Sequence, residues 1–203
     1  MYYLLDSLKE PQTAMYTLAS DLTWTTLEHN LPLAMTAHCS VQISQDPPKV
    51  AFIGGVPTAD NLWSDVKLDQ IKIFNMSASG DEIWTDGPTL PSTVVRGGLI
   101  GCYKVPNENK VIFGCSFASG QKAYEWNLDD DSIMELFDCL NRGAKFYVLA
   151  DGTVIASGHN RNIFNFDPTN GFTRTSPFRI AQYSVPHSPP MSLVNPAILD
   201  VCQ

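Results

Sequence analysis

The chain has 203 residues, with 13 Lys or Arg against 21 Asp or Glu, so its formal net charge is −8. The hydrophobic share of 44% is typical of a folded globular protein. The length favours a single domain, because all-β domains often reach about 200 to 250 residues. Nucleic-acid partners require clustered Lys and Arg, and the sequence has no basic run, so we expect no nucleic-acid binding.

The sequence predicts a chain without a membrane-spanning segment. No uninterrupted apolar stretch reaches the roughly 18 to 20 residues that cross a bilayer, and the uncharged segment 181–199 is broken by prolines. The N-terminal residues lack the basic flank and the long apolar core of a secretory signal. We therefore expect a cytoplasmic protein that does not bind membranes.

The cysteines are odd in number and include no C-x-x-C pair, which argues against a zinc site or a redox motif. Free cysteine is among the most buried residue types, so buried free thiols are expected. A disulfide between Cys102 and Cys115 across a hairpin is the alternative, and it requires an oxidising compartment. The five cysteines are Cys39, Cys102, Cys115, Cys139 and Cys202.

Short segments rich in β-branched and aromatic residues alternate with glycine and proline along the chain. The segments 49–54 and 110–114 are examples, and this composition is typical of strands. A helix needs an apolar stripe over about ten or more residues, and 131–140 carries only a weak one. The predicted fold class is all-β.

A repeat organises these strands. Three markers recur at an offset of 59 or 60 residues: Trp24 with Trp84, Gly54 with Gly114, and Leu31-Pro32 with Leu90-Pro91. Such an offset predicts a repeated unit of several strands. In chain order, strands are expected at 15–18 and 22–27 in a partial unit (13–32); at 38–43, 50–55, 70–75 and 82–91 in a first unit (36–91); at 97–103, 111–115, 123–127 and 133–137 in a second (95–140); at 145–149, 152–158, 162–167 and 171–178 in a third (144–178); and at 181–185 and 192–199 in an irregular C-terminal segment (180–203).

Four strands in each unit of roughly 40 to 60 residues are typical of a β-propeller blade. The pattern resembles the kelch family of propellers, whose blades carry a diglycine after the second strand, an aromatic-Asp pair on the third strand and a Trp before Leu-Pro on the fourth. The residues that match this pattern or its divergent copies are Trp24, Gly54, Gly55, Phe74, Trp84, Gly114, Trp126, Gly158, Phe166 and Asp167. The resemblance covers about residues 13 to 178 and implies one kelch-like propeller domain or segment in which these residues have structural roles.

Two arrangements of the units remain open. The chain is either a segment of a larger propeller, or a closed four-bladed ring in which the N-terminal strands join the C-terminal ones. The prolines after His187 and Asn195 interrupt the C-terminal strands, and proline cannot donate to a β ladder. This favours the segment or open array.

Some kelch-type propellers are copper radical oxidases of the galactose-oxidase type, and the segment 151–158 resembles a strand pair common in that group. A fragment of such an enzyme, or of a sugar-processing propeller, is therefore the alternative function. The metal site needs paired His ligands and a Tyr cross-linked to Cys, whereas the histidines at 29, 38, 159 and 187 are scattered. We predict no catalytic residue, no metal and no cofactor.

Two short motifs have ordinary explanations. Asp129, Asp130 and Asp131 supply carboxylates suited to calcium, but consecutive side chains point in different directions, so a solvated turn is favoured. Asn75-Met76-Ser77 matches the N-glycosylation acceptor pattern, which is common by chance, and the cytoplasmic prediction argues against its use.

A recognition surface is the remaining function. Propellers bind with the loops of one face, where the innermost strand of each blade begins and the second strand joins the third. Trp is enriched at binding hot spots and Arg binds carboxylates bidentately, although surface Arg paired with the excess acid is the plainer alternative. We predict a protein-protein interaction module with an acidic partner, and the candidate face carries Trp63, Arg96, Arg142, His159 and Arg161.

Overall fold

The computed structural model describes residues 2–3, 15–18, 23–26, 30–32, 38–55, 69–91, 101–115, 122–139, 144–149, 151–157, 163–167 and 170–174. These residues form fifteen β-strands and one short 3-10 helix, and every strand pair is antiparallel. The prediction of an all-β fold is confirmed. Within this part of the chain, no helix has the length and apolarity needed to cross a membrane.

Most strands belong to three four-stranded sheets, each a meander in chain order. The first sheet contains β4 (Cys39–Gln45), β5 (Pro48–Ile53), β6 (Gln70–Asn75) and β7 (Trp84–Thr89), with η2 (Gly80–Ile83) before β7. The second contains β8 (Gly101–Lys104), β9 (Lys110–Gly114), β10 (Lys122–Asn127) and β11 (Ile133–Asp138). The third contains β12 (Lys145–Val148), β13 (Val154–Ser157), β14 (Ile163–Asp167) and β15 (Gly171–Arg174).

A smaller N-terminal sheet has three strands, β1 (Tyr2–Tyr3), β2 (Tyr16–Leu18) and β3 (Trp24–Thr26). The strands β2 and β3 fall where the sequence predicts them, whereas β1 was not predicted. The strands expected at 181–185 and 192–199 lie outside the described residues, so the choice between a closed ring and an open array is not decided by them. Among the described strands, the sheets are separate and no ladder joins one to another.

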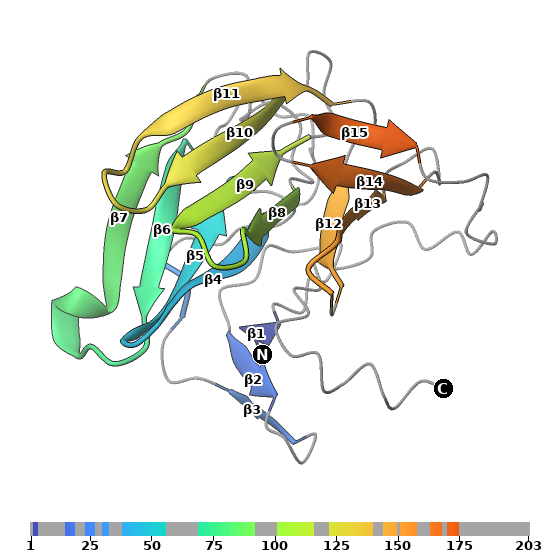
Figure 1. Cartoon of the computed structure of the whole chain (residues 1–203). Helices are drawn as coiled ribbons and strands as arrows, with labels where there is room; N and C mark the ends of the chain where they lie inside the picture. The colour runs from blue at the N-terminus through green and yellow to red at the C-terminus, as the bar shows by residue number, and fades with distance from the viewer. Residues whose placement is uncertain are drawn as a thin grey trace, which may run out of the picture.

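The innermost strands of the three large sheets lie side by side. Contacts join β4 to β8 and β8 to β12, while β7, β11 and β15 form the outer edges (Figure 1). Burial follows this order. Val111, Ile112 and Phe113 in the second strand of the middle sheet are all 0% exposed, whereas the outer strand β11 contains only exposed and partly buried residues. A run of β-branched and aromatic residues covered on both faces is what such a strand requires.

Gly101 lies at a close approach between the second and third sheets. A Cβ atom at this position would lie 2.1 Å from the backbone oxygen of Ala144 and 2.9 Å from the Phe146 ring. Only glycine permits this approach of two backbones. The contact fixes β8 against the start of β12.

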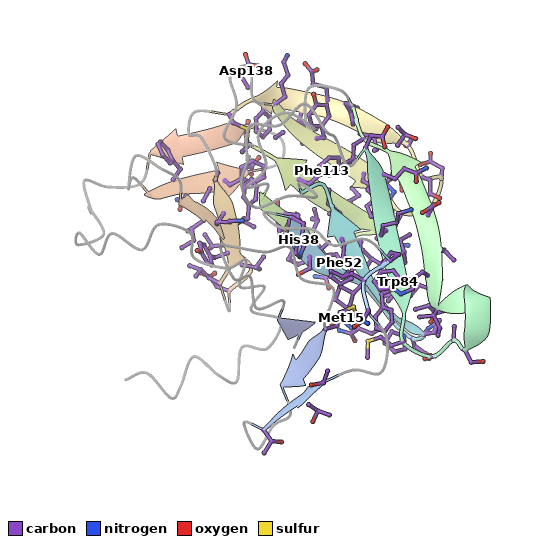
Figure 2. All side chains as sticks on the ribbon, turned by 180° about the vertical axis from the view of Figure 1, so that it is seen from behind. Met15, His38, Phe52, Trp84, Phe113 and Asp138 are labelled. Carbon is purple, nitrogen blue, oxygen red and sulfur yellow. A yellow bond between two sulfur atoms is a disulfide. The ribbon has the colours of Figure 1, made fainter. Side chains whose placement is uncertain are left out.

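Apolar side chains fill the spaces between neighbouring sheets. Ile53 and Ile71 of the first sheet pack with Phe113 of the second in one buried cluster. Ile112 of the second sheet packs with Phe146 of the third in another. A third cluster covers the other side of the first sheet, where Met15 and Leu31 from the N-terminal region pack with Phe52, Phe74 and Val50. Figure 2 shows Met15 and Phe52 on this side. Burial of this apolar area is the main stabilising contribution to the arrangement.

One aromatic residue occupies the same position in each sheet. Phe74, Trp126 and Phe166 are the penultimate residues of the third strands β6, β10 and β14, and they are 3%, 1% and 5% exposed. They belong to three different clusters: Trp126 to the one between the first and second sheets, and Phe166 to the one between the second and third. Each of these rings therefore fills space on one face of its own sheet, and the rings of Trp126 and Phe166 fill the space between neighbouring sheets.

The other motif residues differ in their surroundings. Trp84 is only partly buried and packs on Phe52 and Phe74 of its own sheet, with ring centroids 5.6 and 5.0 Å away. Gly54 and Gly55 have φ angles of 66° and 99°, which L side chains rarely adopt. The side chain of Trp24 and the whole of Gly158 lie outside the described residues.

Gly114 combines a positive φ of 128° with a close backbone contact. A Cβ atom there would lie 2.2 Å from the backbone oxygen of Lys122 on β10. This is the approach of two backbones at a strand end that the repeat pattern predicts for its glycines.

The cysteine prediction is wrong. Cys39 is joined by a disulfide to Cys102, and Cys115 to Cys139. The alternative pair fails because Cys102 lies opposite Phe113, so the hairpin register does not place it against Cys115. The Cys39–Cys102 bond connects innermost strands of different sheets, which spacing in the sequence does not reveal. Cys202 lies outside the described residues.

Candidate functional site

The residues of the predicted binding face lie outside the described part of the chain. This holds for Trp63, Arg96, Arg142, His159 and Arg161. The structure does describe the ends of the innermost strands at which that face was predicted. Two titratable side chains, His38 and Lys145, lie at these ends.

His38 and Lys145 come from different sheets. His38 directly precedes β4, and Lys145 is the first residue of β12. They occupy corresponding positions in the first and third sheets, and the charge of Lys145 acts on the His38 ring. We call this pair of side chains the inner-strand site.

His38 is 2% exposed, and both of its ring nitrogens are buried and have no hydrogen-bond partner among the described residues. Its ring lies 5.7 Å from that of Phe52, centroid to centroid (Figure 2). Burial, together with the smaller effect of the positive charge of Lys145, lowers the pKa of His38 to about 4. His38 is therefore neutral at physiological pH.

Lys145 is partly buried, and burial lowers the pKa of its ammonium group to about 8. A lysine with this pKa is still mostly charged at neutral pH. The inner-strand site thus presents one cation and one neutral imidazole. Two titratable groups with shifted pKa values at the starts of innermost strands, one of which acts electrostatically on the other, form a candidate functional site.

The His38 ring makes protein stability depend on pH. The unfolded ring has a pKa of 6.5 and the folded one about 4, so between these values the unfolded chain binds more protons. The contribution of His38 to the free energy of unfolding is therefore fully present above pH 6.5. It is lost as the pH drops towards 4, by about 3 kcal/mol. The measurement is the free energy of unfolding of wild type and His38→Phe between pH 4 and 8.

His38→Phe is expected to match or exceed the wild-type stability at pH 7.5, because it removes two buried nitrogens that no described residue pairs. The difference between the two proteins should then grow as the pH falls, since the carboxylates are common to both. Parallel pH profiles would mean that His38 is not buried as a neutral ring.

A second feature lies at the opposite end of the sheets. A pocket of about 470 Å³ opens between the second and third sheets, lined among others by Tyr103, Thr153, Asn165, Phe166 and Asp167. The Tyr103 hydroxyl is buried, and no residue in the described part of the chain forms a hydrogen bond with it. Burial raises its pKa, and the charge of Asp167 adds to this effect, so the hydroxyl stays protonated.

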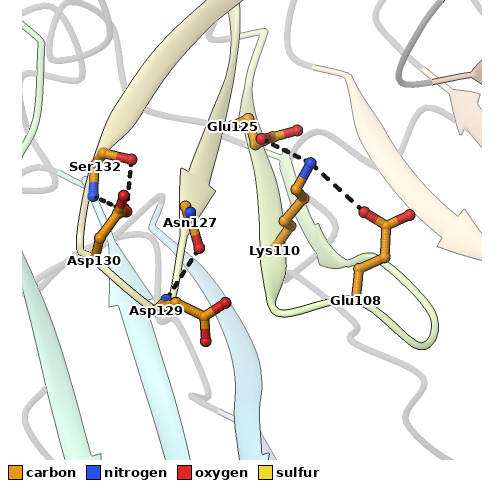
Figure 3. Close-up of polar contacts among 7 residues, drawn as sticks. All are labelled: Glu108, Lys110, Glu125, Asn127, Asp129, Asp130 and Ser132. Carbon is orange, nitrogen blue, oxygen red and sulfur yellow. Dashed lines mark hydrogen bonds and ion pairs between the residues drawn. The ribbon is translucent and has the colours of Figure 1, made fainter.

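The acidic turn between β10 and β11 is used for structure. Asp129 accepts a hydrogen bond from Asn109 at 2.7 Å, and Asp131 accepts one from the Trp126 indole at 3.0 Å. Asp130 accepts two hydrogen bonds from Ser132 (Figure 3). The three carboxylates thus point towards different partners. In the described part of the chain, no group of three or more His, Cys, Asp or Glu side chains is arranged to hold a metal ion.

Beside this turn, Lys110 forms ion pairs with Glu125 at 3.1 Å and Glu108 at 3.6 Å (Figure 3). Lys72 with Asp86 and Lys122 with Glu135 are further pairs on the sheet surfaces. Such exposed pairs contribute little to stability. They account for several of the lysines in an acidic chain.

No family model matches this chain, and no curated protein matches it significantly. The kelch resemblance therefore stays a prediction from the sequence. The function has to be argued from the arrangement of the strands and the inner-strand site.

Sequence reasoning missed the residues that the geometry singles out. The sequence places His38 and Lys145 at strand ends of the predicted binding face but does not single them out as binding residues, and it places Tyr103 only within a strand. Their positions were within the predicted strands, but burial of a polar side chain depends on the neighbouring sheet. The sequence offers one signal for Tyr103: on β8 its side chain points to the opposite face from those of Cys102 and Lys104. This alternation does not show whether Tyr103 lies in the core or lines a pocket.

Proposed function

We propose that the chain is a kelch-like propeller module that binds a protein partner and has no catalytic role. The supporting observation is the arrangement of three consecutive four-stranded sheets with β4, β8 and β12 side by side and with buried second strands. Repeated β units that share their interfaces and expose their outer strands are expected to serve as binding surfaces. The binding face in this proposal is the end at which the innermost strands begin.

An acidic partner fits this face best. Lys145 supplies a partly buried cation there, and Arg142 precedes it by three residues in the sequence. A carboxylate contact in such a partly desolvated position is stronger than on an open surface. Because the chain has a net charge of −8, a group of cations at one end attracts an acidic partner in a defined orientation.

The test is a loss of binding without a loss of folding. Replacing both Arg96 and Arg142 by Glu should abolish binding of the partner that affinity capture and mass spectrometry identify. The thermal midpoint should stay nearly unchanged, because the proposal takes both arginines to lie on an exposed face and exposed charges contribute little to stability. Binding is measured with the purified partner at several salt concentrations, since an electrostatic contact weakens with salt.

The matched control changes the same number of charges at the other end of the sheets. Lys49 lies opposite Asn75 and Lys104 lies opposite Val111, both away from the inner-strand site. The double variant Lys49→Glu with Lys104→Glu should therefore bind normally. Equal binding by both double variants, or a loss in both, would contradict the proposed face.

A further inference from the structure

We propose that Asn75 is an N-glycosylation site and that the chain folds in an oxidising secretory compartment. Asn75-Met76-Ser77 is an acceptor triplet, and the sequence contains no other Asn-x-Ser or Asn-x-Thr triplet. The motif alone is weak. Two structural observations, independent of each other and of the proposed binding function, support its use.

The first observation is the pairing of four cysteines in two disulfides, Cys39–Cys102 and Cys115–Cys139. Disulfides form and persist in secreted and surface proteins and are rare in the cytosol. Each bond forms when two thiols lose two protons and two electrons to an oxidised thiol-disulfide oxidoreductase of the compartment. The disulfides thus argue against the cytoplasmic location that the sequence predicts.

The second observation is the conformation of the triplet. Asn75 is the last residue of β6, Met76 and Ser77 form the turn that follows, and Ser77 is exposed. The Asn75 side-chain oxygen accepts a hydrogen bond from the Ser77 backbone N–H at 3.2 Å. No hydrogen bond from the Asn75 side-chain nitrogen to any described residue is present, and this nitrogen is the atom that receives the sugar.

The position of the triplet keeps a glycan away from the inner-strand site. Asn75 lies opposite Lys49 at the start of β5, next to the turn that connects β4 and β5. His38 precedes the other end of β4, where Cys39 lies opposite Ile53. A glycan on Asn75 therefore extends from the opposite end of the first sheet and leaves the proposed binding face open.

The chemistry requires a lipid-pyrophosphate-linked oligosaccharide as the donor. The Asn75 side-chain nitrogen forms a bond to C1 of the first sugar, and the bond between C1 and the pyrophosphate oxygen breaks. The lipid pyrophosphate leaves with the bonding electrons, and the amide proton passes to a base of the transferase. Nothing is oxidised or reduced in this step.

The decisive experiment uses the protein isolated from the cells that express its own gene. Treatment with peptide N-glycosidase in ¹⁸O-labelled water should lower its mass and convert Asn75 to a labelled Asp, which peptide mass spectrometry detects. The same map, made without reduction, should contain the two disulfide-linked peptide pairs. An unmodified Asn75 peptide would overturn the proposed glycosylation site. Free thiols at the four cysteines would overturn the proposed folding in an oxidising compartment.

Matched variants separate use of this site from general glycosylation. In cells that secrete the chain, Asn75→Gln and Ser77→Ala should abolish the glycosidase-sensitive mobility shift, and Ser77→Thr should retain it. Asn127 accepts a bond from the Asp129 N–H at 3.0 Å in the equivalent turn of the second sheet, so Asp129→Ser creates a comparable acceptor there. Glycosylation of that engineered site without glycosylation of Asn75 would contradict the proposal.

Discussion

Replacing Trp126 by alanine is expected to lower the free energy of unfolding by about 3 to 5 kcal/mol, the usual cost of truncating a large buried aromatic residue. The indole is 1% exposed and lies in the cluster between the first and second sheets. It also donates a hydrogen bond to Asp131 at 3.0 Å, which the variant loses. The measurement is the denaturant midpoint together with the slope of the transition.

Trp84→Ala is the matched control. Trp84 is one of the repeat markers in the sequence. It is only partly buried on the outer strand β7, and it contacts aromatic rings of its own sheet. A smaller loss of stability is therefore expected. If Trp84→Ala costs as much as Trp126→Ala, the interface between the sheets is not where the structure places it.

Removing the Cys39–Cys102 disulfide with the double variant Cys39→Ala and Cys102→Ala is expected to cost about 4 kcal/mol. The bond closes a loop with a sequence separation of 63 residues, and the lost restriction of the unfolded chain grows with loop length. Because it joins β4 to β8, the variant should also loosen the contact between the first two sheets. Hydrogen exchange at β4 and β8 measures that loosening.

The second disulfide provides the comparison. Cys115–Cys139 has a separation of 24 residues and joins the ends of β9 and β11 within one sheet, so its removal should cost about 3 kcal/mol. Exchange rates at β4 should then change little. A reductant should have no further effect on a variant that lacks both bonds. A wild-type denaturant midpoint that is the same when the chain is unfolded with and without reductant would contradict both pairings.

The strands could be predicted from the sequence because their signals are local. β-Branched and aromatic runs such as Val111–Phe113 form strands wherever apolar cover is available, and glycine and proline mark their ends. The 60-residue offset between Trp24 and Trp84 places those strands in repeated units. The observed sheets follow these units. Of the described strands, the sequence does not predict β1. This strand has two residues, and it forms by pairing with β2 rather than from a pattern in its own sequence.

The candidate site was predictable only in part. The sequence indicates which strand ends should form the binding face, but not that His38 and Lys145 act on each other there. Their pKa values depend on burial between sheets, and burial is a property of the packed array. The burial of the Tyr103 hydroxyl likewise depends on the packing of two sheets, because Tyr103 lines a pocket between them.

The sequence by itself determined the fold class, the order of the strands and the aromatic position that Phe74, Trp126 and Phe166 share. Tertiary structure alone decided which partners these elements take. Cys39 pairs with Cys102 and Gly101 contacts Ala144 because neighbouring inner strands bring distant residues within bonding distance. Trp126 is enclosed and Trp84 is not, although both are tryptophans on strands. A local pattern specifies the conformation of a segment, whereas contacts between segments depend on how whole sheets pack.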